Sequence, residues 1–167
     1  MLPPTANRQP PTLLTILLVA LVAFPVAAGD LDATRATLRE RMVRLINRDR
    51  QAFGLRPVAL DAQASAIGDA YCEAQLRNRT TGHFTIDGLA PYMRYSFAGG
   101  NDGVSENAAA WSADYTFNER ALVEMLGRSQ DSMMAERPPR DGHRKTILDP
   151  HATHVGIGLA WEKGEFR

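Results

Sequence analysis

The stretch DGHRKTILDPHATHVGIGLAW, residues 141–161, joins two patterns that together decide the fold. Its first half places His143 directly after an Asp-Gly turn and at the start of a short helical pattern. In its second half Val155, Ile157, Leu159 and Trp161 alternate with glycines and an alanine. This alternation predicts a strand over 153–162, and the small residues predict that a helix or another backbone approaches it closely.

Three longer helical patterns precede this stretch, over residues 32–54, 61–79 and 118–134. Gly54 and Pro57 predict the end of the first helix, and Asp61 is a suitable N-cap for the second. Apolar residues recur at helical spacing in all three. The predicted inward residues are Leu38, Met42, Leu45, Ile46 and Phe53 in the first helix, Ala64, Ile67, Tyr71 and Ala74 in the second, and Leu122, Met125, Leu126 and Met133 in the third.

The connections between these helices are long. A short helix is expected over residues 89–99, and a strand is expected near Val104. Helices first, a clear strand last and long loops between predict an α+β domain built in layers. Because one strand is not stable alone, the loops must supply its partners.

The first 28 residues have the layout of a secretory signal peptide. Arg8 is the only charge there, an apolar run extends from Leu13 to Phe24, and Val26 and Ala28 fit a signal-peptidase site. The run is short for a membrane span, which needs about 20 residues. We expect a mature domain of residues 29–167 that is secreted to the periplasm or the extracellular space, without a stable transmembrane span. The alternative is an uncleaved N-terminal anchor.

The composition of the expected mature chain argues against a nucleic-acid partner. Removing Arg8 leaves 18 basic residues from the 19 of the whole chain, against 19 acidic residues, and no basic surface is concentrated enough for that role. Cys72 is the only cysteine, so no internal disulfide is possible. It lies in a helical pattern and is expected to be a small buried hydrophobe, and the domain is expected to be a monomer.

Four residues stand out as candidates for chemistry. His83 and His143 each follow a glycine in a loop, which allows a sharp turn beside the ring. Glu106 is an acid within a small, apolar segment, and Glu136 ends the third helix, where a negative charge is unfavourable unless it has a partner. Each of the four, taken singly, is also consistent with a structural role. His151 and His154 form a spaced pair, which is a weak zinc signal and is typical of a surface turn.

Five motifs then occur in one order over more than 120 residues, and together they resemble the CAP superfamily. This superfamily, also called SCP-like, groups cysteine-rich secretory proteins, antigen-5 and plant pathogenesis-related-1 proteins. The motifs are LINRDRQAFGLRPVALDAQASAIGDAYCEAQ, GHF, SENAA, MMAER and DGHRKTIL followed by THVGIGLAW. The last of them is most similar to the bacterial branch.

The resemblance implies an α-β-α sandwich in which a small antiparallel sheet lies between helices. It also implies a ligand-binding cleft formed by His83, Glu106, Glu136 and His143. In such clefts the two histidines can hold zinc or another divalent cation, and the glutamates reach it through water. Two imidazoles suit zinc, and the same four groups without a metal would form a hydrogen-bonded network.

The chain departs from the family pattern at three places. Ser105 stands where the family has glycine, and Met133 replaces a tryptophan before Glu136. After a turn over residues 162–164, only Glu165 to Arg167 begin a returning strand, so the final strand is expected to be short or truncated.

Two functions remain open. We favour a protein that binds a small-molecule or lipid ligand, a sterol, or an envelope or other extracellular partner, without catalysis. Arg137, Arg140, Arg144 and Lys145 lie near His143 and either meet anionic groups or form a solvated rim. The alternative is a peptidase-like hydrolase, metal-assisted or with His and Glu as acid and base. Ser105, Ser112 and Ser129 all lack the context of an activated nucleophile.

Overall fold

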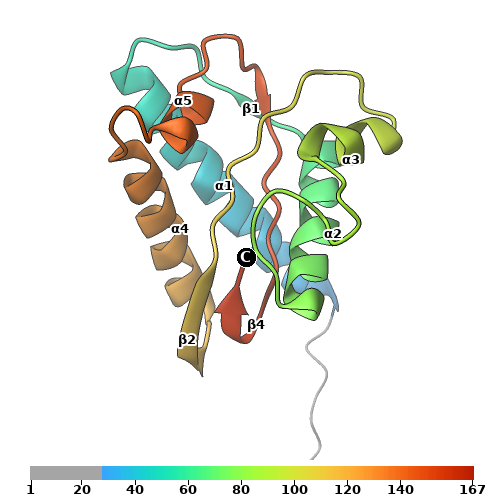
Figure 1. Cartoon of the computed structure of the whole chain (residues 1–167). Coiled ribbons are helices and arrows are strands. Elements are labelled where there is room, and N and C mark those ends of the chain that lie inside the picture. Colours follow the sequence, from blue (N-terminus) through green and yellow to red (C-terminus); the bar gives the residue numbers. More distant parts are fainter. Residues whose placement is uncertain (1–27) are drawn as a thin grey trace, which may run out of the picture.

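The computed structural model describes residues 28–167, and Figure 1 shows the arrangement of its elements. Of the expected signal peptide, residues 1–27 lie outside the described residues, and only Ala28 lies within them. None of the helices within 28–167 is long and apolar enough to span a membrane. The elements are, in chain order, α1 (Ala28–Ala52), β1 (Ala59–Leu60), α2 (Ala62–Asn78), α3 (Pro91–Phe97), β2 (Trp111–Thr116), α4 (Glu119–Met134), α5 (Gly142–Ile147), β3 (His154–Val155) and β4 (Trp161–Phe166).

The helices enclose the strands from two sides. α1 packs against α4, α4 packs against α5, and α2 contacts both α3 and β4. In Figure 1, α4 and α2 stand on opposite sides of the molecule with α1 between them. The predicted α+β sandwich is confirmed, and all five expected helical segments are present. Asp61 caps α2 as predicted, because its carboxylate accepts a hydrogen bond from the backbone N–H of Ala64 at 2.8 Å.

The strands form two short ladders rather than one antiparallel sheet. β1 and β3 pair in parallel over two residues each, whereas β2 and β4 pair antiparallel. The strand expected near Val104 is instead β2, which begins at Trp111. The chain turns back within β4, because Ala160 and Arg167, which flank this element, exchange both backbone hydrogen bonds, at 2.9 and 2.8 Å.

The prediction of one strand over residues 153–162 is wrong for its middle, since residues 156–160 belong to no strand. Side chains from α2 bond to the backbone there in place of a neighbouring strand. The N–H of Ile157 donates to Ser65 Oγ at 3.0 Å, and the N–H of Leu159 donates to Asp69 Oδ1 at 2.8 Å. The small residues therefore indicate close packing against a helix rather than pairing in a ladder. Side chains of that helix satisfy backbone N–H groups of this segment.

Close approach to α2 is confirmed at the two glycines of this segment. A Cβ atom built on Gly158 would lie 2.2 Å from the carbonyl carbon of Gly68. A Cβ atom on Gly156 would lie 2.4 Å from the Cβ of Ala64. Neither glycine has a positive φ angle, so space rather than backbone conformation excludes a side chain here.

The core confirms most of the predicted inward residues. Leu38, Leu122 and Leu126 are buried, as are the sulfur-containing side chains of Met125 and Met133. These methionines are therefore part of the core and do not line an open groove. Phe53 is the exception, because α1 ends at Ala52 and the ring is 52% exposed. Burial raises the pKa of the Cys72 thiol to about 12, so the reactive thiolate is scarce at neutral pH.

Arg50 is almost fully buried, at 1% exposed, and connects α1 to the segment that follows α5. Its guanidinium donates to four backbone carbonyls, those of Arg56, Ile147, Asp149 and Ala152, at 2.8–3.2 Å. No carboxylate within residues 28–167 forms an ion pair with it. Arg50 therefore fixes the C-terminal end of α5, and with it the helix that carries His143.

Candidate functional site

His83 lies in the loop between α2 and α3, and its ring bonds to Glu106. Nδ1 of His83 is 3.1 Å from Glu106 Oε1. The other carboxylate oxygen of Glu106 accepts a hydrogen bond from Arg94 of α3, whose side chain is only 10% exposed. Glu106 thus holds the imidazole with one oxygen while an ion pair compensates its charge.

Arg94 also holds the backbone of this loop. Its Nη1 donates to the carbonyls of His83 and Leu89, at 2.8 and 3.1 Å. The guanidinium stacks 3.7 Å from the ring centroid of Tyr71, which is a close cation–π contact. The hydroxyl of Tyr71 donates in turn to the carbonyl of Gly82 at 2.8 Å. Arg94 and Tyr71 therefore fix both the histidine and the glutamate of this pair.

His143 forms the second pair, with Glu136. Nδ1 of His143 is 2.5 Å from Glu136 Oε1. Glu136 Oε2 accepts from the backbone N–H groups of His143 and Arg144, at 3.0 and 3.3 Å, in the first turn of α5. Asp141, the formal N-cap, makes no side-chain capping bond, so Glu136 takes that role from outside the helix. The unfavourable charge at the end of α4 thus has its partner, and the hydrogen bond from His143 lowers the pKa of Glu136.

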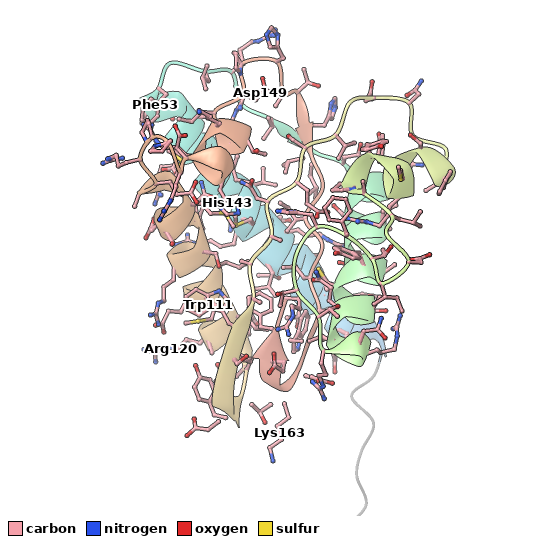
Figure 2. The ribbon with its side chains drawn as sticks, viewed as in Figure 1. Phe53, Trp111, Arg120, His143, Asp149 and Lys163 are labelled. Atoms are coloured by element: carbon pink, nitrogen blue, oxygen red, sulfur yellow. The ribbon has the colours of Figure 1, made fainter. Side chains whose placement is uncertain are left out.

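Asn107 joins the two pairs. It follows Glu106 directly in sequence, and its Nδ2 donates to the backbone carbonyl of His143 at 3.0 Å. Figure 2 shows His143 beside the chain that leads into β2, which is the segment that carries Glu106 and Asn107. His83 comes from a loop and His143 from the first turn of α5, 60 positions later, and one short segment contacts both.

Both histidines face a carboxylate in the same way. A carboxylate only accepts hydrogen bonds, so Nδ1 of each neutral ring must carry the proton and Nε2 must keep its lone pair. This is the arrangement in which a carboxylate orients a metal-ligating histidine. The side chains of His83 and His143 are 40% and 37% exposed, so solvent reaches both.

Two imidazole nitrogens are ligands that suit a divalent cation, and both glutamates are already bonded to the rings. Within residues 28–167 no three His, Cys, Asp or Glu side chains form a ready-made metal site. A cation bound by both rings would have two protein ligands, Nε2 of His83 and Nε2 of His143, and water at its other positions. Such a site supplies a localised positive charge and an exchangeable coordination position for a ligand.

The other candidates from the sequence lie elsewhere. His151 and His154 are exposed, and His154 Nδ1 is 3.0 Å from its neighbour Thr153. Ser112 donates to Glu165 at 3.1 Å, and Ser129 accepts from the indole of Trp111 at 2.8 Å. Ser105 is exposed in the segment just before Glu106.

The sequence did not single out Arg94, although its contacts fix the His83 pair. One arginine in a short helix has no distinctive spacing, and only the fold brings it to Glu106. Asn107 was visible as the residue after Glu106, but its bond to His143 depends on the packing of α5.

The chain is similar to known proteins in family and in fold. The model of the cysteine-rich secretory protein family, CAP, matches residues 43–165. No curated protein shows significant similarity to the chain. The crystal structure of an extracellular protein containing an SCP domain, from Bacillus anthracis strain Ames, superposes with a TM-score of 0.57 at 14% identity. That alignment covers 86% of this chain and 43% of the other, so the chain spans less than half of that protein.

Proposed function

The chain belongs to the CAP family, and on this premise we propose that it is an extracellular binding protein whose His/Glu cleft takes up a divalent cation. The extracellular SCP-domain protein with the same fold supports the location. The predicted signal peptide, which lies outside the described residues, supports it independently.

One observation carries the proposal: each histidine presents Nδ1 to a glutamate and keeps Nε2 for another partner. The same ring orientation is thus repeated in two separate parts of the fold, in a loop at His83 and in the first turn of α5 at His143. In this arrangement the carboxylates of Glu106 and Glu136 orient the rings and increase the basicity of Nε2. A bound cation would offer its open coordination positions to an anionic or polar ligand. Such binding, unlike covalent catalysis, requires no activated nucleophile in the site.

Calorimetric titration of the purified protein with Zn²⁺ tests the proposal. We expect moderate affinity, because only two ligands come from the protein. His83→Ala and His143→Ala should each abolish binding, since each removes one of the two imidazoles. Glu106→Gln and Glu136→Gln should weaken binding by about 10- to 100-fold, because an amide orients the ring less strongly.

The matched control is His154→Ala, which removes an exposed histidine from a neighbouring part of the chain. This variant should bind Zn²⁺ like the unmodified protein. Circular dichroism establishes that every variant is folded. Unchanged affinity in His83→Ala or in His143→Ala would contradict the proposal, as would equal loss in the His154→Ala control.

A further inference from the structure

A second candidate site lies beside α5, and none of its lining residues belongs to the two histidine pairs. It is a depression of about 440 Å³ lined by Ser105, by three residues of α5 and by three residues that follow α5. In full the lining residues are Ser105, Arg144, Lys145, Thr146, Leu148, Asp149 and Pro150. Its volume is within the range of small-molecule sites, about 300–1,000 Å³.

Both walls of this depression are held in place. Asn107 ties the segment that carries Ser105 to the carbonyl of His143 in α5, at 3.0 Å. Buried Arg50 binds the carbonyls of Ile147 and Asp149 on the other wall, at 2.8 and 2.9 Å. The depression is therefore preformed, which lowers the entropic cost of binding.

Arg144 is the notable residue of the lining. Its guanidinium lies 5.0 Å from the centroid of the exposed Phe53 ring, a contact that limits its motion. No carboxylate within residues 28–167 forms an ion pair with it, and its buried Nε has no hydrogen-bond partner. Figure 2 shows Phe53 and Asp149 at the same end of the molecule as α5. An oriented guanidinium that has no partner anion among the described residues is suited to an anion from outside.

The remaining polar side chains of the lining are two hydroxyl groups, one cation and one carboxylate. Ser105 and Thr146 add hydroxyl groups, and Ser105 occupies a position where a glycine would offer none. Lys145 is 73% exposed and forms an ion pair with Asp141 at 2.9 Å. Asp149 opposes an incoming anion, although its Oδ1 already accepts a hydrogen bond from the N–H of His151 at 2.8 Å.

We propose that this depression binds an oxyanion, a phosphate group, through the guanidinium of Arg144 with Lys145 and the hydroxyls of Ser105 and Thr146 as further donors. The planar guanidinium matches two phosphate oxygens, and a hydroxyl can donate to a third. The lining of this depression includes neither His83 nor His143, although Arg144 and Ser105 directly adjoin His143 and Glu106 in sequence.

Titration with inorganic phosphate, followed by amide chemical shifts and by calorimetry, tests this site in the whole protein. Arg144→Met retains a flexible apolar side chain beside Phe53 but removes the charge. It should weaken phosphate binding by at least about tenfold, because a hydrogen bond to a charged group is lost. Asp149→Asn should tighten binding, since it removes a negative charge while its amide oxygen still accepts from His151.

Arg128→Met is the matched control, because Arg128 is an exposed arginine that stacks 5.0 Å from Trp111, outside the depression. It changes the net charge equally and should leave phosphate affinity unchanged. Equal weakening of phosphate binding in Arg128→Met and Arg144→Met would show that only the net charge matters, and it would overturn the proposal. So would weaker binding in Asp149→Asn, or the absence of amide shifts around Ser105 and Thr146.

A second arm distinguishes the two sources of such a group. Phosphatidylcholine vesicles with and without phosphatidic acid are sedimented with the unmodified protein and with Arg144→Met. Binding that requires both phosphatidic acid and Arg144 assigns the site to a lipid headgroup, and binding of inorganic phosphate alone assigns it to a free ligand. No Arg144-dependent binding in either arm contradicts the site.

Discussion

Gly158→Ala is expected to lower the free energy of unfolding by about 3 kcal/mol, at the upper end of the usual cost of overpacking. The new methyl group would lie 2.2 Å from the carbonyl carbon of Gly68 and 2.4 Å from its Cα. Both contacts are with backbone, so no side chain can move aside to relieve them. Separating α2 from this segment would also break the bonds of Ser65 and Asp69 to Ile157 and Leu159.

Gly127→Ala is the control for this experiment. Gly127 lies within α4, and nothing is within 4 Å of the Cβ atom that the substitution adds. Alanine should therefore stabilise the protein by about 0.5–1 kcal/mol, through helix propensity alone. Chemical denaturation measures both variants. A Gly158→Ala protein as stable as the unmodified one would show that residues 156–160 do not contact α2 as described.

Arg50→Met is expected to lower the free energy of unfolding by at least about 3 kcal/mol, because buried carbonyls left without a donor each cost about 1–3 kcal/mol. Four carbonyls lose the guanidinium at once, and only that of Asp149 keeps another donor within residues 28–167, the N–H of Ala152 at 3.2 Å. Methionine fills much of the space of the arginine side chain but has no hydrogen-bond donor. Arg50→Lys should also be destabilising, since one ammonium group cannot reach carbonyls that a guanidinium spans.

Arg44→Met on the same helix is the control. The Arg44 side chain is 60% exposed and pairs only with exposed Glu40, so the change should stay within about 0.5 kcal/mol. Thermal and urea unfolding report all three variants. A loss in Arg50→Met no larger than in Arg44→Met would contradict the role of Arg50 as the anchor of α5.

The helices could be predicted from sequence because their signals are local. Periodic apolar residues, the N-cap Asp61 and the stop at Gly54 need no knowledge of the rest of the chain. The predicted strand is wrong over residues 156–160 because any extended segment with one large and one small face shows the same alternation of residues. Its actual partners, Ser65 and Asp69, lie some 90 residues earlier, and only packing reveals them.

The candidate site shows the same division. The family motifs identified His83, Glu106, Glu136 and His143, and the fold pairs them two by two. The sequence could not show that the glutamates bond to the rings themselves, nor that Arg94 neutralises one of them. These features depend on side-chain directions that residue spacing does not encode. The phosphate site likewise required the fold, because Ser105 and Arg144 are separated by 39 positions (144 − 105).

The most direct test of the account is the tautomeric state of the two histidines. Long-range ¹H–¹⁵N correlation spectra recorded at mildly alkaline pH distinguish an imidazole ring protonated at Nδ1 from one protonated at Nε2. We expect His83 and His143 to carry the proton on Nδ1, with Zn²⁺ shifting the Nε2 resonances of these two rings and leaving exposed His154 unchanged. A proton on Nε2 of either ring, or no Zn²⁺-induced shift at either, would contradict the proposed cleft.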